Sequence, residues 1–137
     1  MMPIYLIQGF FFQNKSWLDI GYVPGGEGVV SIIRKGLCRF MFSGVIYPDQ
    51  NNVLGGLAGE MNDQFGQSQL SHVILFPDER VKFVKKYNHR DDRIEYEFIK
   101  EGSIWVGKYS GPVVKEGNAK CIITQVPEEL FLPPQKT

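Results

Sequence analysis

The chain has 137 residues, a length that suits one domain with a single hydrophobic core. Hydrophobic residues make up 43% of the sequence and aromatic residues 13%, which excludes a generally disordered chain. The 15 Lys and Arg residues balance the 15 Asp and Glu residues, so there is no basic excess to neutralise a run of phosphates. Nucleic acid is therefore not an expected partner.

Cysteine usage and the N-terminal sequence favour a soluble, cytoplasmic protein. Cys38 and Cys121 lie far apart and form no CxxC pair, so we expect free, buried thiols in a reducing compartment. Residues 1–14 lack a basic leader and a cleavage site for secretion. The apolar run at residues 4–12 is too short to span a bilayer, and no membrane span is expected.

The first half of the chain reads as short strands separated by turns. Residues 4–12 are apolar almost throughout, which is typical of a strand covered on both faces or at the seam of a closed sheet. Glycine and proline at residues 24–28 predict a flexible connection. The predicted strands are residues 4–12, 17–23, 29–34, 37–47, 53–61 and 67–76.

Apolar residues alternate with other residues in two of these strands and so predict which face lies in the core. In residues 37–47 the expected core face consists of Cys38, Phe40, Phe42, Gly44 and Ile46. In residues 67–76 it consists of Leu70, His72, Ile74 and Phe76. His72 is thereby predicted to point into the interior.

Residues 80–111 give the clearest strand pattern in the chain. Three strands are predicted, at residues 80–87, 93–100 and 103–110, with turns at residues 88–92 and at Glu101-Gly102. Gly107 lies between two aromatic residues of the third strand and predicts a close backbone approach or a sharp bend. A last strand at residues 119–126, one helical turn at residues 127–131 and a frayed tail at residues 132–137 complete the chain.

These elements predict an all-β fold. Strands recur at intervals of about ten residues with turn signals between them, and no segment has a sustained helical period. Hairpin order and the glycines within strands favour one antiparallel up-and-down barrel of about 8–10 strands over a sandwich. Closing the sheet also removes the edges that long apolar strands would otherwise expose. We expect residues 1–137 to form this single domain.

Lys85 is the exception on the apolar face of residues 80–87. It has the same parity as Phe83 and Tyr87. If this face is buried, the ammonium lies inside the barrel and needs a partner, because an unpaired buried charge is strongly disfavoured. In the other interpretation the sheet twists and the flexible stem of Lys85 carries its charge to water at the rim.

One set of residues is a candidate ligand site inside the barrel. Aromatic side chains would supply apolar area and a few polar groups would fix the orientation of a ligand, with Lys85 as the counter-charge for an anion. The alternative for His72 is a core histidine whose nitrogens have hydrogen-bond partners. The candidate ligand-binding residues are His72, Lys85, Tyr87, Tyr96 and Trp105.

No motif of catalysis or metal binding is present in the sequence. The histidines, cysteines and acids lack the spacing of a zinc or EF-hand site. A nucleophile elbow, a phosphate loop and a dinucleotide fingerprint are also absent from the sequence. We therefore expect no catalytic residues, no metal and no cofactor.

Three segments resemble a pattern of small uncharacterised bacterial proteins. They are Gly59-x-x-x-Asp63-x-Phe65-Gly66, Phe83-x-Lys85-x-Tyr87 and Trp105-x-Gly107-x-Tyr109-x-Gly111. In those proteins a D-x-x-G turn precedes an F-x-K-x-Y strand and a G-x-W-x-G-x-F strand. This resemblance implies a bacterial protein. The barrel inferred above is in turn similar to the calycins, which implies a lipocalin- or streptavidin-like architecture. It implies architecture and not a particular function.

Three functions remain open from the sequence. The first is non-catalytic binding of a small apolar or anionic amphipathic ligand inside the barrel. The second is a filled barrel that serves as a structural or protein-interaction domain, for which a homodimer is one form. The third is an enzyme that uses His72 with Lys85 or a tyrosine as an acid–base pair, which requires the two groups to lie within hydrogen-bond reach.

Overall fold

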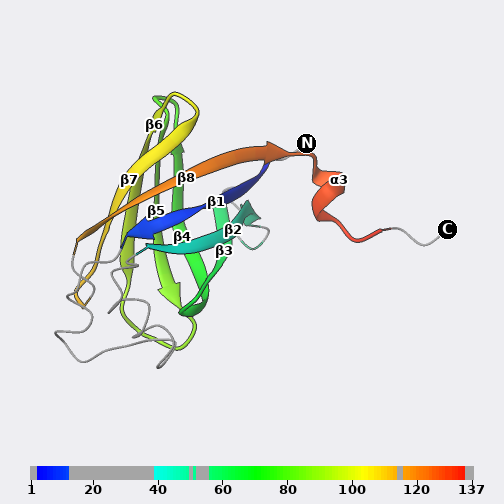
Figure 1. The fold of residues 1–137 in the computed structure, drawn as a ribbon. Helices are drawn as coiled ribbons and strands as arrows, with labels where there is room; N and C mark the ends of the chain where they lie inside the picture. The colour runs from blue at the N-terminus through cyan, green and yellow to red at the C-terminus, as the bar shows by residue number, and fades with distance from the viewer. Residues whose placement is uncertain (1–2, 13–38, 50, 52–55, 114–115, 135–137) are drawn as a thin grey trace.

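The computed structural model describes residues 3–12, 39–49, 51, 56–113 and 116–134. Within these residues, eight antiparallel strands form a closed barrel in which each strand pairs with the next and β8 pairs with β1 (Figure 1). The predicted all-β, up-and-down barrel is confirmed. Its strands are β1 (Ile4–Phe12), β2 (Arg39–Asp49), β3 (Gly56–Asp63), β4 (Gly66–Phe76), β5 (Arg80–Tyr87), β6 (Ile94–Glu101), β7 (Ile104–Ser110) and β8 (Gly117–Val126).

The strand predictions for the described residues hold to within a few positions. β1 and β5 have the predicted bounds, and the other six strands differ from their predictions only at their ends. The helical turn predicted near the C-terminus is α3 (Glu128–Phe131), which Figure 1 shows beyond the end of β8. The strands predicted at residues 17–23 and 29–34 lie outside the described residues.

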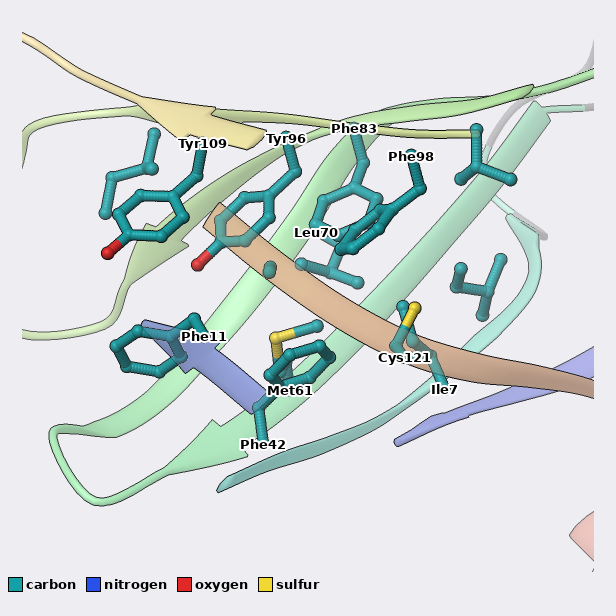
Figure 2. Packing of buried hydrophobic residues seen from close by; sticks show 14 of the residues in the cluster. Ile7, Phe11, Phe42, Met61, Leu70, Phe83, Tyr96, Phe98, Tyr109 and Cys121 are labelled. Carbon is teal, nitrogen blue, oxygen red and sulfur yellow. The ribbon is translucent and has the colours of Figure 1, made fainter. Parts of the chain in front are cut away.

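The interior of the barrel is occupied by large side chains from opposite walls. Phe83, Tyr96 and Tyr109 are cross-strand neighbours on β5, β6 and β7, and their rings stack with centroids 5.1 and 5.3 Å apart. Figure 2 shows this row on one side of the interior and Phe11, Phe42 and Met61 on the other. The ring of Phe11 meets that of Tyr109 edge-on at 5.8 Å, so the two walls are in contact.

Two contacts join strands β6 and β7 to their surroundings. A Cβ at Gly107 would overlap the backbone oxygen of Glu97, which confirms the close approach predicted at this glycine. Tyr109 donates a hydrogen bond from its hydroxyl to the carbonyl oxygen of Phe12 at 2.6 Å, and thereby connects β7 to β1.

Cys121 belongs to the same buried core. It is a free thiol on β8, as predicted, and burial raises its pKa to about 12. Since the thiolate is the reactive form, Cys121 is a packing residue and not a nucleophile. Cys38 lies outside the described residues.

A β-bulge in β4 overturns the predicted core face of this strand. The register with β5 shifts between Ser71 and Ile74, and His72 within the bulge has a positive φ of 51°. An extra residue reverses the side on which the following side chains lie. Leu70 and Val73 are therefore buried, whereas His72 and Ile74 are exposed. The predicted interior position of His72 is wrong.

Candidate functional site

A group of three polar residues lies inside the barrel. Lys85 is fully buried, and its Nζ donates hydrogen bonds to Asp63 Oδ2 at 2.6 Å and to Tyr87 Oη at 3.0 Å. The Tyr87 hydroxyl donates to the same Asp63 oxygen at 2.7 Å. The side chains of Lys85 and Asp63 are both inaccessible to solvent. Of the two interpretations of Lys85, the buried ammonium with a partner is therefore the one observed.

The hairpin between β3 and β4 positions the carboxylate. Asp63 ends β3 with the same inward parity as Met61, and its Oδ1 accepts a hydrogen bond from the backbone N–H of Phe65 at 2.8 Å. An aspartate that bonds the backbone two residues later fixes its own turn. Pairing of β4 with β5 sets Leu70 opposite Lys85, so the lysine extends toward the end of the hairpin. The D-x-x-G turn and the F-x-K-x-Y strand thus meet at these side chains.

Aromatic rings surround the ammonium of Lys85. Its Nζ lies 4.5 Å from the ring centre of Tyr87, 5.1 Å from that of Phe11 and 5.5 Å from that of Tyr96. A cation within about 6 Å of an aromatic face is attracted by the quadrupole of the ring. The rings therefore add to the stabilisation that the carboxylate provides.

Burial dominates the electrostatics of this group. It lowers the pKa of Lys85 below the ordinary value, and the attraction of the Asp63 carboxylate opposes that change. The pKa of Tyr87 is raised well above its ordinary value, first by burial and then by the negative charge of Asp63. Burial also raises the pKa of Tyr96 and of Tyr109. The neutral form of each of these tyrosines is therefore favoured in the folded barrel.

The structure brings together three of the five candidate ligand-binding residues. Lys85, Tyr87 and Tyr96 are neighbours in the interior. Trp105 is only partly buried against the core, and it lies four residues along β7 from Tyr109, or about 13 Å in an extended strand.

His72 is separated from the other candidates by the sheet. It faces solvent at the bulge, where its Nδ1 lies 3.1 Å from Ser71 Oγ. Lys85 is fully buried on the inner side of the barrel. The proposed acid–base pair of His72 and Lys85 is therefore not assembled in this structure.

Sequence reasoning missed Asp63 as the partner of Lys85. Two features of the sequence pointed to it. A lysine on the inward-facing side of a strand requires a carboxylate, and Asp63 is on the inward-facing side of β3, next to the turn that leads into β4. The pairing register was the missing information, because it decides which of the chain's 15 acids reaches Lys85. Phe11 was missed for a similar reason, since its strand closes the barrel from the other wall.

Two open hollows lie on the outer face of β4–β7. Their volumes are about 360 and 550 Å³, and both are lined by His72, Val84, Glu95 and Ser110. The smaller one is also lined by charged residues that pair with each other, with Lys108 Nζ 3.3 Å from Glu116 Oε1 and Lys82 Nζ 3.8 Å from Glu97 Oε2. Mixed charges that are already paired do not favour a ligand of either sign.

A second candidate site is the outer face of β8, β1 and β2, which we call the apolar face. Phe10 pairs with Met41 on β2 and with Lys120 on β8, while Ile122 lies opposite Gln8. Side chains on one face of paired strands lie about 4.5–5.5 Å apart when opposite and about 7–8 Å apart on the diagonal. Its large apolar side chains, with the fraction of each exposed, are Leu6 (37%), Phe10 (42%), Phe12 (37%), Met41 (62%) and Ile122 (46%).

We predict that Lys85 and Asp63 contribute to stability only as a pair. Lys85→Met leaves a buried carboxylate without its ammonium and should lower the free energy of unfolding by about 3–5 kcal/mol. Asp63→Asn in the same chain removes the uncompensated charge but retains an acceptor for the N–H of Phe65, so the double variant should recover much of that loss. Urea unfolding of the two single variants and the double variant measures the coupling.

Lys82→Met is the matched control for this cycle, because Lys82 lies on the same strand but is exposed. An exposed ion pair contributes about 0–1 kcal/mol, so this variant should remain close to the wild-type protein. Additive losses in the Lys85 and Asp63 variants would contradict the predicted coupling.

We also predict that the barrel loses stability above about pH 10. Unfolded tyrosines release their protons near pH 10, whereas Tyr87, Tyr96 and Tyr109 have raised pKa values in the folded state. The stabilisation that they provide is therefore fully present below pH 10. Above pH 10, each tyrosine that stays protonated in the folded state lowers the free energy of unfolding by about 1.4 kcal/mol per pH unit. Lys85 acts in the opposite sense, because its lowered pKa makes its contribution complete only above about pH 10.5.

Urea unfolding at pH values below and above 10 measures this dependence. Above pH 10, the free energy of unfolding of Tyr96→Phe should fall less steeply with pH, because one of the three buried tyrosines no longer contributes. Its stability at neutral pH should change little. An unchanged slope in this variant would show that Tyr96 ionises as readily in the folded state as in the unfolded chain.

Comparisons with known proteins return no match. No family model matches the chain, and neither a curated protein nor a solved structure does so. In the described part of the chain, no helix is long and apolar enough to cross a membrane. Among the same residues, no group of three or more His, Cys, Asp or Glu side chains lies together in a way that would hold a metal ion.

Proposed function

We propose that the barrel is a protein-interaction domain that contacts a partner through its apolar face. The observation that carries this proposal is the contiguous set of large, exposed apolar side chains on β8, β1 and β2. Exposed apolar residues scattered singly are ordinary on protein surfaces, whereas a contiguous group of them is typical of an interaction site.

The outer face of β4–β7 has a different character. Its charged residues pair across strands, as Arg80 does with Glu97 at 3.6 Å. Ile74 is 47% exposed, but its cross-strand neighbour is Lys82. Ile99 and Ile104 are also exposed, but they lie on β6 and β7, toward β8, whereas the paired charges surround Ile74. The contrast between the two outer faces supports the assignment of the partner contact to the apolar face.

The interior supports the same proposal. Lys85 already has a carboxylate, a hydroxyl and three aromatic rings as partners. Its charge is therefore balanced by residues of the chain itself. In the described part of the chain, large side chains such as Phe11, Phe40 and Phe98 are fully buried, as expected of a barrel filled by its own side chains.

Photo-crosslinking can test the apolar face. A benzophenone amino acid at position 41 should form a discrete adduct with one protein in the native host, whereas the same group at position 82 should not. Phe10→Thr should abolish the adduct, because truncating a central apolar contact commonly weakens binding by about 1–2 kcal/mol or more. Ile74→Thr, which removes an apolar side chain of similar exposure from the opposite face, should leave it unchanged.

The identified partner is then titrated in purified form by calorimetry. Phe10→Thr should raise the dissociation constant by roughly tenfold or more. Equal adducts at positions 41 and 82, or an adduct that persists in Phe10→Thr, would contradict the proposed function.

Ligand binding inside the barrel is the second candidate, favoured by the aromatic rings around Lys85. A ligand carboxylate would have to displace Asp63 from this ammonium. We therefore expect octanoate to leave the melting temperature of the wild-type protein unchanged and to raise that of Asp63→Ala, in which the ammonium lacks a carboxylate partner. A rise in the wild-type protein that disappears in Lys85→Gln would instead favour the interior ligand.

A further inference from the structure

The charges nearest Phe10 on the apolar face have a single sign. Lys120 lies opposite Phe10, and Arg39 lies opposite Phe12. Both cations are exposed. Residues 6–12, 39–47 and 118–124, which surround Phe10, contain no aspartate or glutamate. The acids next to these stretches are Asp49, at the end of β2, and Glu60, which lies opposite Val45 on β3. The face is therefore both apolar and cationic, although the whole chain has a formal charge of zero.

The lysine lies within the apolar surface and not at its border. Strand pairing sets Ile99 opposite Val106, Val106 opposite Lys120, and Lys120 opposite Phe10. Phe10 is in turn opposite Met41. This row crosses five strands with the ammonium of Lys120 at its centre. A partner that covers the row takes that ammonium out of water, and this is favourable only if the partner provides a carboxylate.

From this arrangement we infer that the partner is a protein segment that combines apolar side chains with at least one carboxylate. This inference rests on the proposed function and specifies the chemistry of the partner. The apolar side chains of the segment would pack against Phe10, Met41 and Ile122. Its carboxylate would pair with Lys120, and a second acid would be placed to reach Arg39.

A second copy of the chain fits this face less well. In a two-fold symmetric contact the same surface meets itself. Since the charges nearest Phe10 are Lys120 and Arg39, a contact centred on Phe10 would bring like charges together.

An anionic membrane also fits less well. Two cations contribute only about 1 kcal/mol each near an anionic lipid surface. The row follows the closed barrel around five strands and is convex, so a flat bilayer would touch only part of it. A flexible peptide segment can follow the row.

Selection from a displayed library of random short peptides tests the inference on the whole chain. Peptides that combine apolar residues with Asp or Glu should be enriched on the wild-type protein, and their binding should weaken as salt is added. Lys120→Glu should weaken the selected peptides at least tenfold. Lys82→Glu, a charge reversal on the opposite face, should leave their binding unchanged, with circular dichroism confirming that both variants are folded.

The outcomes separate this inference from the proposed function. Enriched peptides that lack acids, or that bind Lys120→Glu as tightly as the wild-type protein, would overturn the acidic partner while their loss in Phe10→Thr would still support the apolar face. If no enriched peptide depends on Phe10, both fail. A dimer in sedimentation velocity, or binding to phosphatidylserine-containing vesicles, that is lost in Phe10→Thr would overturn the inference in favour of a second copy or a membrane.

Discussion

A buried ammonium has to be matched by a carboxylate, and this requirement ties together the parts of the barrel. Lys85 and Asp63 are separated by 22 residues in sequence, yet their charged atoms lie 2.6 Å apart with no access to solvent. Their contact holds the end of the β3–β4 hairpin over β5. Tyr87 bonds both partners, and the ring of Phe11 brings in β1 from the opposite wall. Loss of either charge would leave the other buried and unpaired.

The need of each charge for a partner is met differently in the interior and on the outer surface of the barrel. The interior charge is balanced within the chain, and the charges on the outer face of β4–β7 are largely balanced by each other. The apolar face differs, because Phe10 and Met41 are exposed there and Lys120 has no acid beside it in residues 6–12, 39–47 and 118–124. Exposed apolar side chains around an unpaired cation are a reason to expect a binding partner.

The bulge in β4 shows how one extra residue changes which side chains of a strand are buried. The alternation through Leu70, His72 and Ile74 predicted one buried face, and the extra residue at the bulge moved His72 and Ile74 to the outside. Side chains along a strand alternate between its two faces, so one inserted residue moves every following side chain to the other face. The positive φ of His72 is a property of the paired strands and has no signal in the alternation itself.

The sequence by itself determined the all-β class, the bounds of β1 and β5 and the inward direction of Phe83 and Tyr87, because these follow from local alternation and turn residues. For Lys85 it left open whether the side chain is buried or carries its charge to water at the rim. It also required a partner for Lys85 if that residue was buried. Only the tertiary structure decided that the partner is Asp63, that Trp105 lies away from the polar group, and that exposed apolar residues of three strands adjoin. These facts depend on the pairing register and on the closure of β8 against β1, which are set by contacts between segments far apart in the chain.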